Sequence, residues 1–348
     1  MVRCVSQSGR RSRQTGAALG RQPMKKGGRA FAAAAIIGVA LSGGVSADTL
    51  AQPQDNALER RAADYVLLRE DIAAIEATPF DSAKTTREAH KRLSAHTSKA
   101  LSSGWVAYAA LVAASTPEFA EALQKDMKKS ERGLKGKDAF LARLAADPSY
   151  ARKLKGADAA VERVLSMTAQ DVTRFAALGD AFKTQAYAMQ KTNWGKQRIA
   201  ASSDRLSEAE AYARARPPAS APALSVSSNG GVTAPVLASD SGAWSPNWGA
   251  AGSPGDNSEP NAQVIMDRFL NLAARYDIGA MNEKVVDVYA KNDRADQCLS
   301  MATLTLRQCI AATRTPYEEA FCLGEHALID TASCVGWVAG AGAEDQQG

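Results

Sequence analysis

Apolar residues recur at the spacing of α-helices along most of the chain after residue 57. Between residues 58 and 75 they return every three or four positions, and the charged residues fall outside that stripe. This pattern predicts an amphipathic helix of about five turns. The stripe consists of Leu58, Ala62, Tyr65, Leu68, Ile72 and Ile75.

A second apolar line predicts one long helix over residues 81–115. His96 falls on this line and fits a core histidine with a hydrogen-bonded ring. His90 lies six residues earlier, about 120° around the same helix, so the two rings cannot share a metal ion. The C-terminal part of the line carries Leu101, Trp105, Tyr108 and Val112.

Cap residues and prolines predict where the next helices begin. Thr116-Pro117-Glu118 and Asp147-Pro148 place a capping side chain before a proline, whose missing N–H is not needed in the first helical turn. A further helix is predicted to start at 168–171 and to end at Gly195 as its cap. The last helix of this half is predicted over 203–216.

Composition supports helices and divides the chain. Alanine is abundant and aromatic residues make up only 6%, which favours helices packed through small residues over strands. From Pro217 to Pro260 the chain lacks Lys and Arg and is rich in Pro, Ala, Ser, Gly and Asn, as disordered linkers are. We expect an all-α fold with a multi-helix N-terminal bundle at 48–216, a disordered linker at 217–260, a smaller disulfide-stapled helical module at 261–340 and a flexible tail at 341–348.

Two apolar stripes define the C-terminal module. The first, from Ile265 to Tyr276, predicts a helix. The second alternates steps of three and four from Val285 to Cys309, as in a helix packed along a neighbour. Asn292 and Asp293 interrupt this stripe, so the pattern fits one helix or two.

The four cysteines of this module predict two nested disulfides. Their even number, without a CxxC spacing, favours disulfides over a zinc site. Neighbours on one helix, such as Cys298 and Cys309, are about 16 Å apart, far beyond the roughly 5.5 Å that a disulfide spans. The crossed pairing needs parallel helices, which the short turn near Thr315 does not allow. The remaining pairs, Cys309–Cys322 and Cys298–Cys334, match an antiparallel hairpin.

The sequence indicates where the second helix of this hairpin starts, and the cysteine spacing indicates that it is not regular as far as Cys334. Thr315-Pro316-Tyr317-Glu318 supplies a cap, a proline at the first position and a Glu for a capping box. Eleven residues from Cys298 to Cys309 rotate a helix by about 20° net, but twelve from Cys322 to Cys334 rotate it by about 120°. We therefore expect the second helix to bend or end before Cys334. The layout resembles the twin-cysteine hairpins of small oxidised helical proteins, which we take as shared geometry only.

The N-terminus predicts export. Met24-Lys25-Lys26 opens a basic segment, residues 30–45 are small or apolar, and Val45-Ser46-Ala47 has the small residues of a cleavage site. The run is short for the roughly twenty residues that span a bilayer. We expect a cleaved leader within an N-terminal extension at 1–47 and no transmembrane anchor, with an uncleaved anchor as the alternative and Met24 as a competing start.

Removal of the leader changes the charge. Residues 1–47 hold eight basic and no acidic residues, so the mature chain carries a net charge of about −3. Nucleic-acid binding needs a basic surface on the folded domain. The sequence therefore predicts that nucleic acid is not a partner.

Sequence motifs for catalysis are absent. There is no G-x-S-x-G, S-x-x-K, H-E-x-x-H or phosphate-binding loop. Asp71 and Glu76 have the spacing of a solvated helix face, and His326 with Asp330 fits a charge pair on a helix surface. We predict no catalytic residues, no cofactor and no metal site.

Three tryptophans and one basic segment are the candidate partner contacts. Trp244 and Trp248 favour docking on the protein's own surface, with a sugar ring or a partner groove as alternatives. Trp194 stands among cations, where an arginine packed on its ring competes with a binding lip. The segment 125–137 fits weak contact with anionic lipid or glycan, although its interleaved acids favour a solvated loop.

These features favour a non-catalytic, periplasmic or secreted bacterial envelope protein with a structural or protein-interaction role, for which an envelope protein is the expected partner. The alternatives are an enzyme acting on cell wall or another envelope substrate and a module that binds a small ligand or glycan. A cleft with converging carboxylates would favour the enzyme, and a deep apolar pocket would favour the binder.

Overall fold

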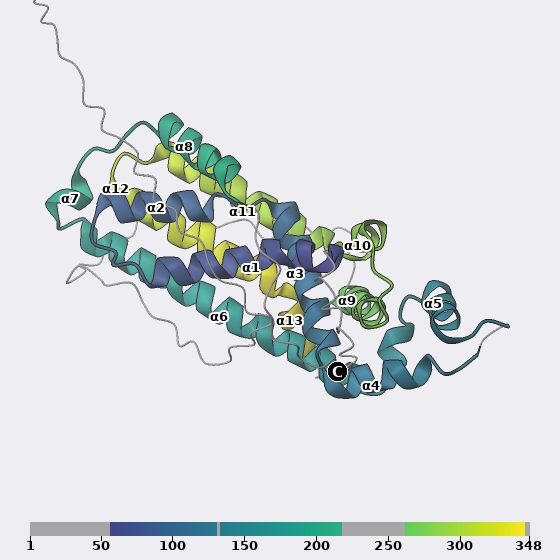
Figure 1. The fold of residues 1–348 in the computed structure, drawn as a ribbon. Helices are drawn as coiled ribbons and strands as arrows, with labels where there is room; N and C mark the ends of the chain where they lie inside the picture. Colours follow the sequence, from purple (N-terminus) through teal and green to yellow (C-terminus); the bar gives the residue numbers. More distant parts are fainter. Residues whose placement is uncertain (1–55, 131–132, 218–261, 345–348) are drawn as a thin grey trace, which may run out of the picture. The chain divides into compact units, whose positions relative to one another are not determined.

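The computed structural model describes residues 56–130, 133–217 and 262–344 of the 348-residue chain. Within these ranges the chain is helical and forms no strand, so the predicted all-α class is confirmed (Figure 1). The predicted leader and residues 218–261 of the predicted linker lie outside the described ranges. The α-helices are α1 (Ala57–Glu76), α2 (Ala83–Leu93), α3 (Ser98–Ala114), α4 (Pro117–Asp126), α5 (Gly136–Ala146), α6 (Ala157–Met189), α7 (Asn193–Lys196), α8 (Ser202–Ala215), α9 (Ala262–Asp277), α10 (Glu283–Tyr289), α11 (Asp293–Ala312), α12 (Pro316–Cys322) and α13 (Asp330–Glu344), with a 3₁₀ turn η1 (Tyr150–Lys153) and a π-helical segment η2 (Leu323–Ile329).

α3 is the centre of the fold because its side chains are buried on every face. All residues from Leu101 to Ala113 are buried, and most of them are small. α3 packs against α1, α6, α9 and α11 (Figure 1). Gly104 allows the closest approach, since a Cβ there would lie 2.9 Å from the backbone nitrogen of Tyr65. The alanine-rich composition therefore allows helices to pack densely around α3.

Helices from both sides of the undescribed segment share one core. α9 and α11 pack on α3, while α12, η2 and α13 pack on α6. The ring of Trp105 in α3 meets that of Phe269 in α9 edge to face, with 6.5 Å between centroids. The sequence left open whether the two helical parts pack together; the described helices form one compact unit. α13 extends to Glu344, into the segment where a flexible tail was expected.

The prediction of a single helix over 81–115 is wrong, because the chain breaks between α2 and α3. Thr97 caps α3 by accepting a hydrogen bond from the backbone N–H of Ala100 at 3.2 Å. Ser and Thr side chains satisfy free backbone groups at helix ends better than in helix interiors. The apolar spacing continues across the break, so periodicity alone did not reveal it.

α6 is one helix of 33 residues, so the predicted start at 168–171 is also wrong. The hydroxyl of Thr168 donates to the carbonyl of Val164 at 2.9 Å and accepts from the indole N–H of Trp105 at 3.2 Å. The threonine therefore has polar partners inside the fold and does not act as a cap. α6 ends at Met189, and Gly195 belongs to α7 instead of capping α6.

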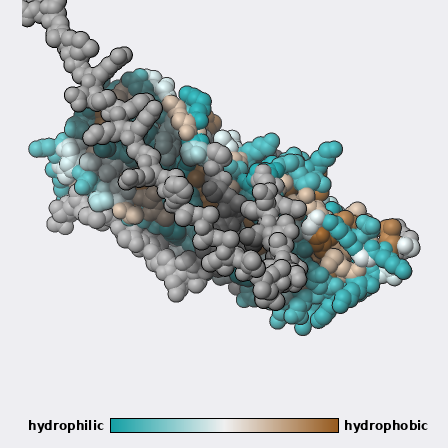
Figure 2. All heavy atoms as spheres, in the orientation of Figure 1, coloured by the Kyte–Doolittle hydropathy of each residue, from teal (hydrophilic) through white to brown (hydrophobic). Residues whose placement is uncertain are grey.

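α4 and α5 form an arm at one end of the described part (Figure 1). The surface over this arm is mainly hydrophilic, with isolated hydrophobic spots (Figure 2). Pro117 begins α4, as the proline signal predicted. The signal at Asp147-Pro148 precedes only the 3₁₀ turn η1. The predicted basic loop is shortened by the helices, since α4 reaches Asp126 and α5 begins at Gly136.

The cysteines of the C-terminal hairpin pair in the nested order that their spacing predicted. The Cα–Cα distances are 5.7 Å for Cys309–Cys322 and 5.4 Å for Cys298–Cys334. The two bonds join α11 to α12 and to α13. The stripe left open as one helix or two forms α10 and α11, because Asn292 caps α11.

The π-helical segment η2 resolves the unequal cysteine spacing. η2 follows α12 and leads into α13 without a break. A π-turn takes up one more residue than an α-turn, which removes about 100° of rotation. The net rotation between Cys322 and Cys334 then falls from about 120° to about 20°, the value between Cys298 and Cys309. Of the two alternatives expected before Cys334, a bend or an end, the end is wrong, because the helical path continues through η2 into α13; regular α-helical geometry is interrupted at η2.

η2 lies unusually close to α6 where two glycines meet. A Cβ on Gly179 would lie 2.7 Å from the carbonyl oxygen of Gly324 and 2.6 Å from Cγ1 of Ile329. Real Cβ atoms do not approach backbone atoms so closely. The absence of a side chain at Gly179 is therefore a condition for this contact.

Gly179→Ala is expected to lower the free energy of unfolding by about 1–3 kcal/mol, because the new methyl group overlaps a backbone oxygen that cannot rotate away. At a solvent-exposed helix position, Gly→Ala would instead raise the free energy of unfolding by up to about 1 kcal/mol. The sign of the measured change therefore shows whether α6 and η2 are in close contact at Gly179. Urea unfolding followed by circular dichroism measures it. Asp180→Ala, at the exposed next residue, is the control and should stay within about 0.5 kcal/mol.

Candidate functional site

Asp71 lies at the centre of a buried polar cluster, the Asp71 cluster, which also contains Arg92, His96 and Arg216. Oδ1 of Asp71 accepts hydrogen bonds from Arg92 at 3.0 Å and from Arg216 at 2.8 Å. Oδ2 accepts from Arg216 at 2.5 Å and lies 2.8 Å from Nε2 of His96. These partners belong to α2, the α2–α3 turn and the end of α8, so one carboxylate on α1 connects three other segments.

Local structure explains how these groups meet. The break between α2 and α3 places His96 in a turn, which takes it off the helical line expected for it. Its ring is hydrogen-bonded and largely buried, as the sequence led us to expect. Burial alone would raise the pKa of Asp71, but hydrogen bonds with His96 and Arg216 hold it below its ordinary value of 3.8. The carboxylate is therefore charged at neutral pH and paired with cations.

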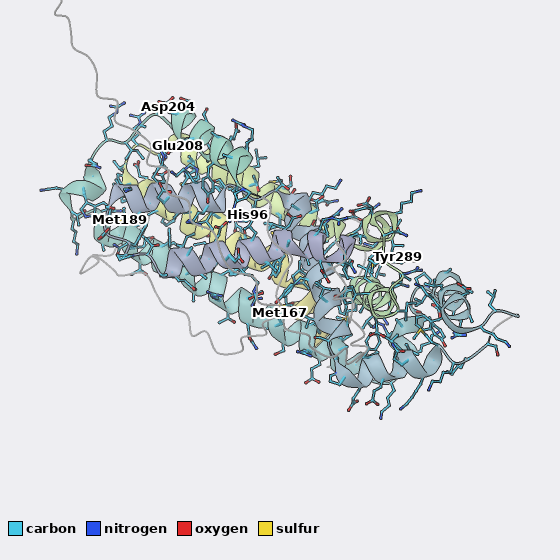
Figure 3. The ribbon with its side chains drawn as sticks, viewed as in Figure 1. His96, Met167, Met189, Asp204, Glu208 and Tyr289 are labelled. Atoms are coloured by element: carbon cyan, nitrogen blue, oxygen red, sulfur yellow. A yellow bond between two sulfur atoms is a disulfide. The ribbon has the colours of Figure 1, made fainter. Side chains whose placement is uncertain are left out.

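His96 also lines a hollow between α8 and α11; Figure 3 marks its place in the fold. The hollow measures about 40 Å³, which admits water but not a drug-sized ligand. Ser94 and Thr303 bring hydroxyl groups to it, and that of Thr303 donates to the carbonyl of Leu299 at 2.8 Å. The lining residues are Leu93, Ser94, His96, Leu206, Ala209, Glu210, Thr303, Leu306 and Arg307.

A second buried group, the Arg205 cluster, joins Arg205 of α8, Glu319 of α12, His90 of α2 and Thr313 after α11. Nδ1 of His90 lies 2.8 Å from Oε1 of Glu319, and the guanidinium of Arg205 lies 3.0 Å from the same oxygen. Arg205 also donates to the carbonyl and the hydroxyl of Thr313 at 3.0 and 2.8 Å. Burial would raise the pKa of Glu319, but its bonds to His90 and the charge of Arg205 hold it below 4.5.

The third histidine, His326 in η2, pairs with Asp330 one turn later at 2.9 Å. The sequence placed this pair on a helix surface, but the side chain of His326 is fully buried and that of Asp330 is only 14% exposed. The surface interpretation of this pair is therefore wrong, because η2 packs its histidine into the core against α6.

The solvated-face interpretation of Asp71 and Glu76 is wrong as well, because both are buried. The Nε–H of Arg174 is shared between the two carboxylate oxygens of Glu76, each at 3.0 Å from Nε. Asp171 of α6 likewise accepts from the Tyr65 hydroxyl at 2.9 Å. Burial raises the pKa of Asp171 despite the neighbouring charge of Arg69. These bonds link α1 to α6.

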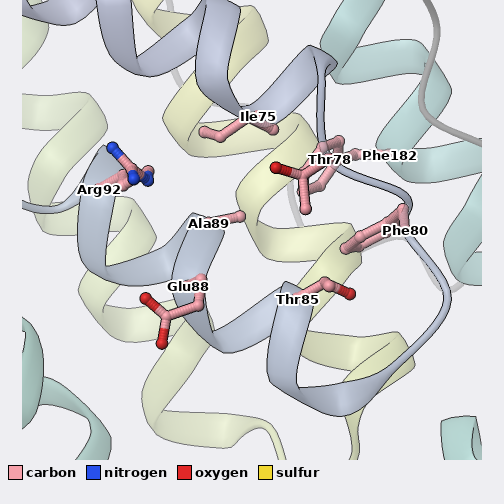
Figure 4. A pocket seen from close by; sticks show the side chains of 8 residues that line it. All are labelled: Ile75, Thr78, Phe80, Thr85, Glu88, Ala89, Arg92 and Phe182. Carbon is pink, nitrogen blue, oxygen red and sulfur yellow. The ribbon is translucent and has the colours of Figure 1, made fainter.

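A second hollow is smaller. It measures about 20 Å³ and lies where the end of α1, the turn after it and α2 face α6 (Figure 4). Phe80 and Phe182 stack on one side of it, with 4.4 Å between ring centroids. Its size fits a water molecule and no larger ligand.

The candidate partner residues are spread over the chain. Trp194 lies on α7, half-buried and packed against the core. Trp244 and Trp248 lie outside the described residues, so their predicted docking is untested. Among the described residues, no three His, Cys, Asp or Glu side chains gather in a way that would hold a metal ion. No helix in the described ranges is long and apolar enough to cross a bilayer.

The sequence did not identify Asp71, Arg205 and Glu319 as members of buried clusters. One signal was present: Asp71 lies three residues after Leu68 and four before Ile75, which is the spacing of the apolar stripe itself. A charge at a core position needs a partner. Its partner, however, comes from distant helices that periodicity does not reveal.

No protein-family model, curated protein or solved structure matches this chain. Within the described part of the chain, histidines, carboxylates and arginines meet at the contacts between helices.

Proposed function

We propose that this protein is exported, periplasmic or secreted, and acts without catalysis as a structural or protein-interaction component of a bacterial envelope. The observation that carries the proposal is the use of its histidines. Each pairs with a carboxylate, and two of those carboxylates, Asp71 and Glu319, also bind arginines from other segments. Two of the three histidines, the side chains best suited to acid–base chemistry near neutral pH, thus take part in contacts between helices.

Two features support the export part of the proposal. The N-terminal sequence has the pattern of a cleaved leader. The two disulfides are typical of proteins that fold outside the cytoplasm, where thiols are oxidised.

His96 favours a second candidate function, an enzyme acting on cell wall or another envelope substrate. It lines a hollow together with Ser94 and Thr303, whose side chains carry hydroxyl groups. A general base must come within about 2.6–3.2 Å of the group whose proton it takes. Nε2 of His96 is held by Asp71, so this candidate requires the other ring nitrogen to reach Ser94 or a bound water.

His96→Gln separates the two candidates, because glutamine keeps a donor for Asp71 but cannot act as a base. We expect tagged mature protein with this change to keep its helical circular dichroism and to recover the same crosslinked proteins from the envelope fraction as the wild type. Asp204→Asn, at an exposed residue of α8, is the matched control. If His96→Gln fails to complement a deletion strain while its fold and crosslinked partners are unchanged, the enzyme is favoured.

A further inference from the structure

We propose that the end of the α4–α5 arm docks on an anionic lipid surface. This site, the arm tip, consists of residues 125–130 and 133–138. The inference goes beyond the proposed function, since a structural or interaction role does not require contact with lipid.

Positive charge dominates the exposed surface of the arm tip. Five lysines are exposed there, whereas Asp138 is the one exposed acid among the described residues of the tip. The mature chain as a whole carries about −3, so this local charge runs against the balance of the protein. The five are Lys125, Lys128, Lys129, Lys135 and Lys137.

Asp126, one of the acidic residues interleaved with the lysines in the sequence, does not contribute to the surface of the arm tip. The side chain of Asp126 is only 2% exposed. Its Oδ2 accepts hydrogen bonds from Arg143 at 2.9 Å and from the Tyr150 hydroxyl at 3.0 Å, and Oδ1 lies 2.5 Å from Nζ of Lys129. Burial would raise the pKa of Asp126, but its bonds to Lys129 and Tyr150 hold it below 3.8. The Asp126 carboxylate is therefore charged, but it is buried and paired with cations inside the arm. It does not present an exposed negative charge that would repel an anionic surface.

An apolar side chain stands among these lysines. Leu134 is 42% exposed, one of the few large hydrophobic residues so exposed in the described chain. Gly133 precedes Leu134, and Gly136, the first residue of α5, follows Lys135; their φ values of 83° and 58° are ones that L-residues avoid. Leu134 and Lys135 therefore lie together between these two glycines, in the connection from α4 to α5.

Cations around an exposed leucine suit an anionic bilayer surface better than a soluble polyanion. Lysine side chains near a bilayer are attracted to its anionic headgroups, and burial of an apolar side chain in the interface is favourable. A soluble polyanion offers nothing for Leu134 to enter. Three of the five ammonium groups have partners: Lys137 donates to the carbonyl of Gly279 at 2.7 Å, Lys125 lies 3.8 Å from Glu121, and Lys129 pairs with Asp126. The ammonium groups of Lys128 and Lys135 have no ion pair or hydrogen bond with another described residue.

Vesicle sedimentation tests the proposal with the full mature chain, disulfides intact. We expect binding to phosphatidylcholine vesicles that contain phosphatidylglycerol and none to phosphatidylcholine alone. Raising salt from about 0.1 to 1 M shortens the Debye length from about 10 to 3 Å and should release most of the protein. The double variant Lys128→Gln/Lys135→Gln should weaken binding at least about tenfold, and Leu134→Ser should weaken it further.

Lys84→Gln/Lys196→Gln is the matched control, because it removes two exposed lysines from α2 and α7. It should bind like the wild type. Equal loss in the two double variants, equal binding to neutral vesicles, or no binding to anionic vesicles would overturn the proposal. Competition by soluble heparin that does not depend on Leu134 would do so too, in favour of a glycan partner.

Discussion

Arg205→Met is expected to lower the free energy of unfolding by about 3–5 kcal/mol, because it leaves Glu319 charged and buried without its cation. Arg205 is fully buried, and its guanidinium lies 3.0 Å from Glu319. It also donates to the carbonyls of Ile310 and Thr313 at 3.3 and 3.0 Å. Methionine fills much of the same volume but donates no hydrogen bond, so these acceptors all lose a partner. Urea unfolding followed by circular dichroism measures the loss.

Arg307→Met is the matched control because Arg307 joins the same two helices, α8 and α11, at the surface. Its guanidinium lies 3.3 Å from Glu210, and both side chains are at least half exposed. Exposed ion pairs contribute about 0–1 kcal/mol, so this variant should unfold almost like the wild type. If Arg205→Met and Arg307→Met lowered the free energy of unfolding by similar amounts, burial of the arginine would not explain the loss of stability.

The effect of Arg205→Met should also depend on pH. The pKa of Glu319 lies below 4.5 in the folded protein, so its ion pairs stabilise the fold above that pH and are lost as the pH falls. Without Arg205 that pKa rises, and Glu319 becomes neutral more readily in the variant. The difference in stability between wild type and variant should therefore be full near neutral pH and should narrow below about pH 4.5.

Loss of the inner disulfide is the second large effect that we expect. Cys309→Ala/Cys322→Ala opens a loop whose ends are 13 residues apart, which should destabilise the fold by about 3 kcal/mol through the entropy of the unfolded chain. Cys298→Ala/Cys334→Ala should cost less than its separation of 36 residues suggests, because the inner bond already shortens the outer loop.

Hydrogen exchange distinguishes the two losses. Without the outer bond, protection should fall in the first turns of α11 and in α13 while the turn before α12 stays protected. Without the inner bond, protection should fall along the whole hairpin. Peptide mapping without reduction checks the premise, and a Cys298 peptide linked to a Cys322 peptide, or four free thiols in exported protein, would falsify it.

Element types were predictable from this sequence, but several boundaries were not. The stripe from Leu58 to Ile75 became α1 because its apolar face is continuous and flanked by charge. The break before Thr97 and the continuity through Thr168 were both misread. Threonine caps a helix in the first case and bonds to another helix in the second, and only the tertiary contacts distinguish these uses.

The disulfides were predictable and the buried clusters were not, for a physical reason. A disulfide obeys fixed lengths, so helix rise and cysteine spacing eliminate the wrong pairings. A buried carboxylate such as Asp71 is stabilised by whatever cation reaches it. Its partner Arg216 is 145 residues away, and no local rule selects it.

The π-turn of η2 bears on how this hairpin tolerates changes in length. A one-residue insertion in an ordinary α-helix rotates everything after it by about 100° and would move Cys334 away from Cys298. Here the widened turn confines the extra residue to Leu323–Ile329. A homologous chain one residue shorter in this stretch would form an uninterrupted α-helix and keep both disulfides. A change of one residue in the length between Cys322 and Cys334 is therefore compatible with the same two disulfides. An inserted residue between Cys298 and Cys309 would keep both disulfides only if α11 also contained a π-turn.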